Sequence, residues 1–311
     1  MRALVTGVAG FLGSTLAEAL LESGFDVLGV DAFTTNYSPD VKRENLRQLQ
    51  TDRGFRFVEA DLRHADLDPL LDGVTHVAHL AALPGVRSSW GDSFREVAEH
   101  NVVATQRLLD AAQKRPVERV AVASSSSVYG AAQRAPTPED EHRRPISPYG
   151  VTKLATEALV HAYRSEHGVP AVALRYFTVY GPRQRPDMGF HRFFEAGRRG
   201  TPVTVFGDGK QTRDFTFVDD AVSATMASLT RPVKEFAYNV GGGHRVALGE
   251  VLDRIEGLVG RTIERRHIEA QRGDPRDTSA DTSLARRDLG YEPRTSLEQG
   301  LKRQWEWQRN I

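Results

Sequence analysis

Three glycines, Gly7, Gly10 and Gly13, constrain this chain more than any other feature. The apolar residues 3–5 before them predict a short buried strand, and residues 14–22 after them have helical spacing. Glycine at such a junction allows a tight turn, lets a pyrophosphate approach the backbone, and lets the helix pack against the strand. The helix N-terminus adds free N–H groups and a partial positive charge for phosphates. The segment therefore predicts a dinucleotide site.

A second strand pattern, residues 25–31, ends in Asp31. A carboxylate at this position can bind both ribose hydroxyls and repels a 2′-phosphate, which favours NAD over NADP. The alternative is a glycine-rich turn without a ligand, and the combination of strand, turn, helix, strand and acid disfavours it. We expect this motif to contact NAD through Gly7, Gly10, Phe11, Leu12, Gly13 and Asp31.

Strand and helix patterns alternate through the first part of the chain. Such alternation predicts an α/β protein with a Rossmann-type, doubly wound parallel sheet. The expected strands are residues 55–58, 76–80, 117–123 and 171–176, and the expected helices are 94–114 and 149–166.

Regular alternation ends near Pro182, and shorter elements follow. We expect an NAD-binding core in residues 1–182 and a smaller C-terminal α/β substrate-binding part in residues 183–311, whose chain can cross back to the core. The helical patterns of this second part lie near residues 190–200, 220–230, 248–259 and 296–308.

The composition narrows the class of protein. The 311 residues carry 41 acidic and 41 basic side chains, so charge gives no reason to expect nucleic acid or a membrane as partner. The chain has no cysteine, which excludes a thiol nucleophile, and its histidines lack metal-ligand spacing. The N-terminus shows neither a signal-peptide pattern nor a membrane-length apolar run. We expect a cytoplasmic protein without a metal site.

Tyr149 and Lys153 lie one helical turn apart, downstream of a serine run that contains Ser125. Residues four apart face the same way on a helix, and a nearby cation favours the ionised phenol and so lowers its pKa. Tyrosine can then act as a base near neutral pH. The spacing suits removal of a sugar hydroxyl proton while a hydride leaves the same carbon. The alternative is a surface tyrosine stacked on a lysine stem.

The glycine spacing, together with Ser125, Tyr149 and Lys153, resembles the extended short-chain dehydrogenase/reductase family of nucleotide-sugar epimerases and dehydratases. The similarity runs nearly end to end. It implies that these three side chains are catalytic, that a UDP-sugar is the substrate, and that helices 94–114 and 149–166 pair two subunits in a homodimer. It also implies further NAD contacts at Asp61, Leu62, Leu80, Ala81, Ala82, Asn101, Ser124, Tyr149, Lys153 and Tyr176.

Within this family, the two positions before Val128-Tyr129-Gly130 indicate the type of reaction. Dehydratases that resemble this chain carry Asp-Glu there, and decarboxylases carry Glu in the second position. Here the residues are Ser126 and Ser127. Without an acid, the resemblance implies oxidation followed by reduction, which is epimerisation.

The sequence around Arg87 and Arg185 looks like UDP-glucuronate 4-epimerases, and Thr178 stands where simple UDP-galactose epimerases usually have Asn. The resemblance implies that Arg185 faces the sugar carboxylate, a role that suits the planar, permanently charged guanidinium. Arg213 and Arg276 would bind the UDP pyrophosphate, and Val205 and Phe206 would flank uracil. The full set of expected substrate residues is Pro84, Arg87, Ser125, Ser126, Ser127, Thr178, Arg185, Val205, Phe206, Arg213 and Arg276.

The expected mechanism begins with a Tyr149 phenolate, favoured by Lys153 and the positive nicotinamide, which takes the 4-hydroxyl proton while Ser125 binds the same oxygen. The 4-keto sugar rotates and takes hydride back on its other face. A uronic acid then becomes a β-keto acid that readily loses CO₂, so the site must hold its carboxylate. Three alternatives remain: a 4-epimerase for UDP-glucose and UDP-galactose, a decarboxylase or dehydratase, and a non-catalytic NAD-binding sensor.

Overall fold

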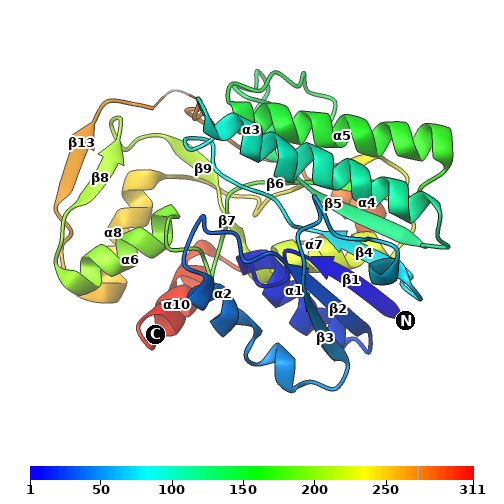
Figure 1. Ribbon diagram of the computed structural model, residues 1–311. Coiled ribbons are helices and arrows are strands. Elements are labelled where there is room, and N and C mark those ends of the chain that lie inside the picture. The colour runs from blue at the N-terminus through cyan, green and yellow to red at the C-terminus, as the bar shows by residue number, and fades with distance from the viewer. Residues whose placement is uncertain (272) are drawn as a thin grey trace.

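The computed structural model describes residues 1–271 and 273–311, and these form a seven-stranded central sheet (Figure 1). Every pair of neighbouring strands is parallel. The order is β11-β6-β5-β4-β1-β2-β3, so the sheet winds outward in both directions from β1 and β4. The strands are β1 (Arg2–Thr6), β2 (Asp26–Asp31), β3 (Phe55–Glu59), β4 (His76–His79), β5 (Arg119–Ser125), β6 (Ala171–Tyr176) and β11 (Ala237–Val240).

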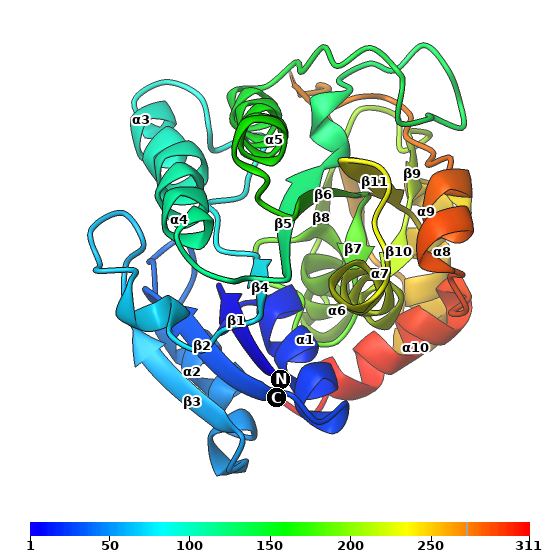
Figure 2. The same ribbon diagram turned by 90° about the vertical axis from the view of Figure 1, so that its right-hand side faces the viewer.

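Helices cover both faces of this sheet, which confirms the predicted Rossmann-type fold (Figure 2). Successive residues of β5 show the burial on both sides: Val120 and Val122 face one core, Ala121 faces the other, and all are at most 1% exposed. Such two-sided burial explains why the strands are continuous apolar runs. One face carries α1 (Phe11–Glu22) and α7 (Val218–Thr230), and the other carries α4 (Ala104–Gln113) and α5 (Pro148–His167).

The helix expected at 94–114 is divided. It begins as α3 (Ser93–Ala98), widens into a π-helical turn (Glu99–Val103), and continues as α4. Short elements complete the first part of the chain: α2 (Pro39–Leu46) and 3₁₀ turns at Leu49–Thr51, Pro69–Leu71 and Ser126–Val128.

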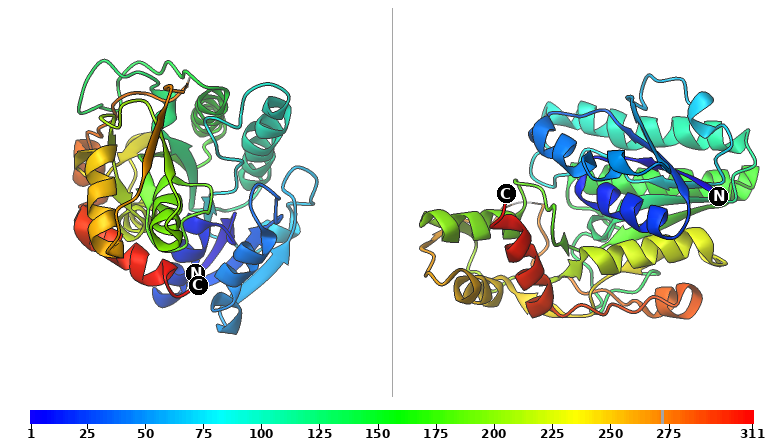
Figure 3. Two further views of the ribbon diagram at one scale, coloured as in Figure 1. Left: turned by 90° about the vertical axis from the view of Figure 1, so that its left-hand side faces the viewer. Right: turned by 90° about the horizontal axis from the view of Figure 1, so that it is seen from below.

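The C-terminal part lies beside the core (Figure 3) and contributes strands to three two-stranded sheets among the described residues, one of which includes β7 from before Pro182. The pairs are β7 (Val179–Tyr180) with β10 (Thr216–Phe217), β8 (Val203–Phe206) with β13 (Arg265–Ile268), and β9 (Thr212–Asp214) with β12 (Arg245–Ala247). Its other helices are α6 (Gly189–Arg199), α8 (Leu248–Val259), α9 (Ser283–Leu289) and α10 (Leu297–Gln308).

The chain crosses back from the second part to the first. After Pro182, α7 packs on α1, and β11 pairs with β6 at the edge of the central sheet. Residues on both sides of position 182 thus build the same sheet. A domain boundary at that residue stays a prediction.

Candidate active site

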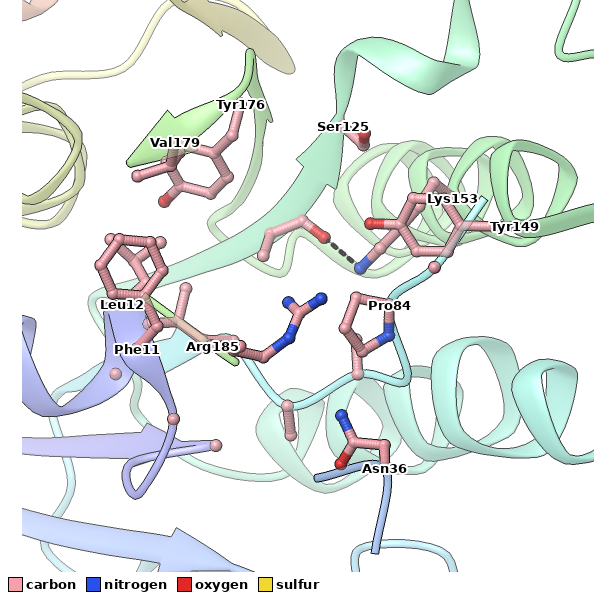
Figure 4. Close-up of a pocket in the computed structure, with 18 of the residues that line it drawn as sticks. Phe11, Leu12, Asn36, Pro84, Ser125, Tyr149, Lys153, Tyr176, Val179 and Arg185 are labelled. Atoms are coloured by element: carbon pink, nitrogen blue, oxygen red, sulfur yellow. Dashed lines mark hydrogen bonds between the residues drawn. The ribbon is translucent and has the colours of Figure 1, made fainter. Parts of the chain in front are cut away.

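A cavity of about 440 Å³ opens at the carboxyl ends of the central strands, where the strand order reverses between β1 and β4 (Figure 4). Ligands bind at such a switch point in open α/β sheets. Most of the residues expected from the sequence line this cavity: Gly7, Gly10, Phe11, Leu12, Gly13, Asp31, Asp61, Leu62, Leu80, Ala81, Ala82, Pro84, Ser124, Ser125, Ser126, Ser127, Tyr149, Lys153, Tyr176, Thr178, Arg185 and Arg213.

The glycine turn makes room for close backbone approaches. Gly7 has φ +70°, and a Cβ on it would lie 2.8 Å from the Ala81 nitrogen. A Cβ on Gly13 would lie 2.1 Å from the Gly7 carbonyl oxygen, so helix α1 could not pack this closely against the turn with any larger residue. Gly10 is the N-cap and supplies no side-chain cap, and the first turn of α1 lines the cavity. This helix end fits the pyrophosphate of a dinucleotide.

Asp31 ends β2 and stands at the cavity wall. Its two carboxylate oxygens accept hydrogen bonds from the N–H groups of Ala9 (3.1 Å) and Phe33 (2.8 Å). Burial raises the pKa of Asp31, and these hydrogen bonds and the charge of Lys42 oppose the shift. The carboxylate is thus held in place at the end of β2, the position from which an acid binds a ribose diol in dinucleotide folds.

Four residues that line the cavity near Asp31 were not expected from the sequence, namely Thr34, Asn36, Tyr37 and Lys42. Lys42 donates hydrogen bonds to the Thr34 carbonyl (2.6 Å) and to the Asn36 side chain (3.1 Å), and its ammonium lies 4.6 Å from the Tyr37 ring centroid. All four residues line the cavity. A lysine on a short polar helix normally indicates a solvent-facing charge, so only the fold reveals that this one is 4% exposed.

The start of helix α5 aims Tyr149 and Lys153 at the cavity. Ser147 caps the helix by accepting a hydrogen bond from the Gly150 N–H (3.1 Å), and Pro148 takes the first helical position. Figure 4 shows both side chains beside the end of β5, where Ser125 lies. The Lys153 ammonium donates to the Ala123 carbonyl (2.7 Å) and lies 5.9 Å from the Tyr149 ring centroid.

The charges around Tyr149 act differently from the expectation based on Lys153 alone. Burial raises the pKa of the Tyr149 phenol, and a hydrogen bond with Ser125 and the charge of Arg185 only partly oppose this shift. Burial also lowers the pKa of Lys153 to about 8, opposed by Glu157. The expected lowering of the Tyr149 pKa is therefore wrong for the chain alone, because burial outweighs the attraction of a lysine that is directed at a carbonyl.

Arg185 comes from the turn that follows β7, and its guanidinium points into the cavity (Figure 4). Asp187 binds one edge of the guanidinium, with Nε to Oδ1 at 3.0 Å and NH2 to Oδ2 at 2.9 Å. Thr178, Ser126 and Ser127 line the same cavity. A guanidinium offers five donors, so the edge that Asp187 does not use can bind a second carboxylate.

Arg213 lines the cavity, and its NH2 group donates to Asp274 (2.6 Å). The other residues expected to bind the UDP group do not line the cavity. Arg87 stacks on the Phe206 ring, 3.9 Å from its centroid. Arg276 pairs with Asp208 (3.0 Å) at the surface. Val205 is 1% exposed and belongs to the hydrophobic core. Of the described residues, Arg87, Val205, Phe206 and Arg276 thus fall outside the cavity wall.

Asn101 also lies behind the wall rather than on it. It sits in the π-helical turn, and its side chain binds both backbone groups of Leu83 (2.8 and 3.1 Å) and the Thr152 hydroxyl (3.0 Å). Its amide therefore ties the loop after β4 to helix α5. Ser124 lines the cavity, but its hydroxyl is directed away, toward Glu157 (2.6 Å).

A sequence model of the NAD dependent epimerase/dehydratase family matches residues 3–241. This chain belongs to that family. Its predicted membership of the nucleotide-sugar epimerases and dehydratases is confirmed, as is the prediction of an NAD-dependent enzyme.

Individual relatives match this chain over nearly its whole length. A UDP-glucuronate 4-epimerase of Thermodesulfobacterium geofontis is 38% identical, over 98% of this chain and 95% of the relative. A Bacillus subtilis protein named as an uncharacterized UDP-glucose epimerase is 45% identical, over 97% and 96%. The crystal structure of UDP-glucuronic acid 4-epimerase from Bacillus cereus, in complex with UDP-glucuronic acid and NAD, superposes with a TM-score of 0.96 at 40% identity, covering 100% and 99%.

Among the described residues, no helix combines the length and apolar character needed to cross a bilayer.

Proposed function

We propose that this protein is a UDP-glucuronate 4-epimerase, which inverts C4 through a 4-keto sugar to give UDP-galacturonate. The observation that carries the proposal is Arg185, whose guanidinium projects into the cavity that Ser125, Tyr149 and Lys153 also line. A fixed cation beside the reacting groups suits a sugar that carries a carboxylate. The named activities of the Thermodesulfobacterium and Bacillus cereus relatives support the same substrate.

The glycine turn between β1 and α1, together with Asp31, fits NAD. It combines a helix N-terminus, a backbone that a pyrophosphate can approach closely, and a fixed carboxylate. Bound NAD would supply a reversible hydride acceptor for the sugar carbon. The chain itself handles the proton. Tyr149 takes it from the 4-hydroxyl, Ser125 hydrogen-bonds the same oxygen, and Lys153 supplies positive charge one turn away.

A uronic acid substrate places a second demand on the site. Oxidation at C4 makes a β-keto acid, which loses CO₂ when its carboxylate bond stands perpendicular to the ketone plane. Arg185 can hold the carboxylate away from that geometry through the guanidinium edge that Asp187 leaves open. Ser126, Ser127 and Thr178 add hydroxyl groups to the same wall.

The carboxylates at the cavity argue against a dehydratase. Among the described lining residues they are Asp31, Asp61 and Asp274, and each already has partners. Asp31 accepts two backbone N–H groups, Asp61 pairs with Arg63 (2.6 Å), and Asp274 pairs with Arg213. Where an acid would assist elimination, the chain has Ser126 and Ser127.

The second candidate is a 4-epimerase for a neutral UDP-hexose, which the name of the Bacillus subtilis relative favours. The two candidates differ in what they require of Arg185, because a neutral sugar gives its guanidinium no charged partner.

The decisive experiment incubates purified protein with UDP-glucuronate or UDP-galactose and resolves the sugar products by chromatography. UDP-galacturonate from UDP-glucuronate supports the proposal, and Tyr149→Phe should abolish it. UDP-glucose from UDP-galactose, without turnover of the uronate, would establish the second candidate. A UDP-pentose or a stable 4-keto sugar would identify a decarboxylase or dehydratase, and no product from either sugar would favour the NAD-binding sensor.

We further propose a homodimer that pairs the helices of residues 93–113 and 148–167. These neighbouring helices expose large apolar residues, namely Phe94 (41%), Val103 (45%) and Val151 (47%). Exposed apolar side chains that gather on one side are typical of an interface. A cytoplasmic location stays a prediction from the sequence, and cell fractionation tests it.

A further inference from the structure

Arg175 and Glu157 form an ion pair in which both side chains are fully buried. Arg175 lies on β6 and Glu157 on α5. The contact is bidentate, with Nε to Oε1 and NH2 to Oε2 both at 2.8 Å, and neither side chain is exposed. Isolated buried charges are very costly, so removal of either partner alone would leave an unfavourable charge in the interior.

The pair is attached to the catalytic strand. The Ser124 hydroxyl donates to Glu157 Oε1 (2.6 Å), and Ser124 precedes Ser125 on β5. One turn earlier on α5, the Lys153 ammonium donates to the Ala123 carbonyl (2.7 Å). Helix α5 is therefore fastened to the end of β5 at two successive turns, one on each side of the Ala123–Ser124 peptide.

The NH1 group of Arg175 makes two further hydrogen bonds. Its NH1 group donates to the Tyr129 hydroxyl (2.7 Å) and to the Glu139 carbonyl (2.9 Å). Tyr129 donates in turn to the Asn239 side chain on β11 (2.7 Å). The network thus joins β5, β6, β11 and α5 behind the cavity, and Arg143 adds a more distant contact with Glu157 (3.7 Å).

Stability alone is a poor reason for such a pair, since well-packed apolar residues of similar volume often serve as well or better. What the pair provides is a directional connection between elements that carry different catalytic groups. Ser125 belongs to β5, whereas Tyr149 and Lys153 belong to α5. A shift of one element along the other would change the separation of the serine hydroxyl and the phenol.

We propose that Glu157 and Arg175 act as a positioning pair that fixes Ser125 relative to Tyr149. The inference rests on the proposed roles of Ser125 and Tyr149, but it does not depend on which UDP-sugar is turned over. Neither member of the pair lines the cavity among the described residues. Both act through Ser124 and the β5–α5 contact, and the charge of Glu157 also acts on Lys153.

The test removes both charges of the pair together, in the double variant Glu157→Leu/Arg175→Met, and the kcat of each protein is measured across pH because Glu157 also opposes the lowering of the Lys153 pKa. The assay uses UDP-glucuronate or UDP-galactose, whichever the parent epimerises, so a wrong substrate assignment leaves this test intact. We expect a folded, NAD-binding protein whose kcat falls roughly 10- to 100-fold with KM nearly unchanged, as expected when reacting groups are displaced by about 1 Å. Glu157→Asp, which keeps the charge, should retain more kcat than Glu157→Gln.

A double-mutant cycle with Ser125→Ala separates positioning from general loosening. If the pair acts through Ser125, Ser125→Ala should cost much less kcat in the double variant than in the parent. Multiplicative losses, or a double variant with kcat within about twofold of the parent, would overturn the proposal. Asp288→Asn is the matched control, because Asp288 is a buried carboxylate paired with Arg287 (2.8 Å) away from the cavity. This variant should lower stability and leave kcat unchanged.

Discussion

Arg183 and Glu18 form a bidentate ion pair, with NH1 to Oε2 at 2.9 Å and NH2 to Oε1 at 2.6 Å. Glu18 lies on α1, the helix that follows the glycine turn, and Arg183 begins the turn that carries Arg185. Arg183 has φ +66°, a left-handed conformation that is uncommon for any residue except glycine. The ion pair therefore holds a strained turn against α1, the helix that we propose binds the NAD pyrophosphate.

Glu18→Ala should loosen this turn and misplace Arg185. We expect KM for UDP-glucuronate to rise roughly three- to tenfold, with NAD affinity nearly unchanged, because the glycine turn itself is untouched. Steady-state kinetics and NAD titration measure the two effects. Glu22→Ala, at an exposed position on the same helix, should have no effect on either quantity. An unchanged KM in Glu18→Ala would show that the turn keeps its shape without the pair.

Arg185→Ala should lower epimerisation of UDP-glucuronate by roughly 100-fold or more, since a charged partner of the substrate is lost. Because the carboxylate of the 4-keto sugar is then less restrained, we expect part of the product to appear as CO₂ and a UDP-pentose. Chromatography and trapping of released CO₂ from labelled substrate measure this partition. Arg185→Lys should fall between the parent and Arg185→Ala. Full activity of Arg185→Ala on the uronate would refute the carboxylate role.

Asp31→Asn should weaken NAD binding about tenfold. It should also reduce the ratio of NAD affinity to NADP affinity, because the negative charge that repels the 2′-phosphate of NADP is gone. An amide also offers one acceptor oxygen where the carboxylate offers two to the N–H groups of Ala9 and Phe33. Calorimetric titration with both dinucleotides gives the affinities. Asp40→Asn, at an exposed position on the next helix, is the control. An unaltered ratio of the two affinities would contradict the ribose role of Asp31.

Lys153 should make the stability of the NAD-free protein depend on pH. Its pKa is lowered to about 8 in the folded protein, whereas an unfolded lysine titrates near its ordinary value of about 10.4. The unfolded chain thus binds more protons between these values, and stability rises with pH through this window. Relative to Lys153→Met, the parent should gain on the order of 2 kcal/mol in unfolding free energy from pH 8 to pH 10. Denaturant unfolding of both proteins at each pH measures it, and parallel curves would contradict the prediction.

Val103→Glu combined with Val151→Glu should convert the proposed dimer into monomers, because each charge would be buried at the interface. Light scattering after size-exclusion chromatography gives the mass of both proteins. Glutamates at these exposed positions should leave the fold intact, which circular dichroism checks. A parent that is already monomeric would refute the dimer, and an unchanged dimer in the variant would place the interface elsewhere.

The sequence predicts the parts of the site that lie at strand ends. Gly7, Asp31 and Ser125 occupy such positions, and parallel strands bring their carboxyl ends to one edge, so alternation of elements suffices to place these residues together. Tyr149 and Lys153 follow from helical spacing. The helices at 248–259 and near 296–308 were also predictable, because their apolar faces repeat regularly.

Other features depend on three-dimensional packing. Lys42, on α2, lies close enough for its charge to lower the pKa of Asp31, and nothing in the local sequence pattern indicates that this polar helix buries its lysine. The π-helical turn at Asn101 interrupts the α-helical period over only a few residues, so the sequence pattern predicts a continuous helix there. Val205 and Phe206 alternate on one strand, and only the fold shows that the first is core and the second faces Arg87.

The pairing of β11 with β6 has a mechanical consequence. Because β11, from beyond Pro182, pairs with β6 in the central sheet, this part of the chain is anchored to the core, and moving it as a separate body would break that ladder. Inversion of a carbon nevertheless requires that its opposite face be offered to the same hydride carrier. Because Ser125 ends a strand of that sheet and Tyr149 lies on a helix packed against it, we expect the moving part to be the sugar ring itself.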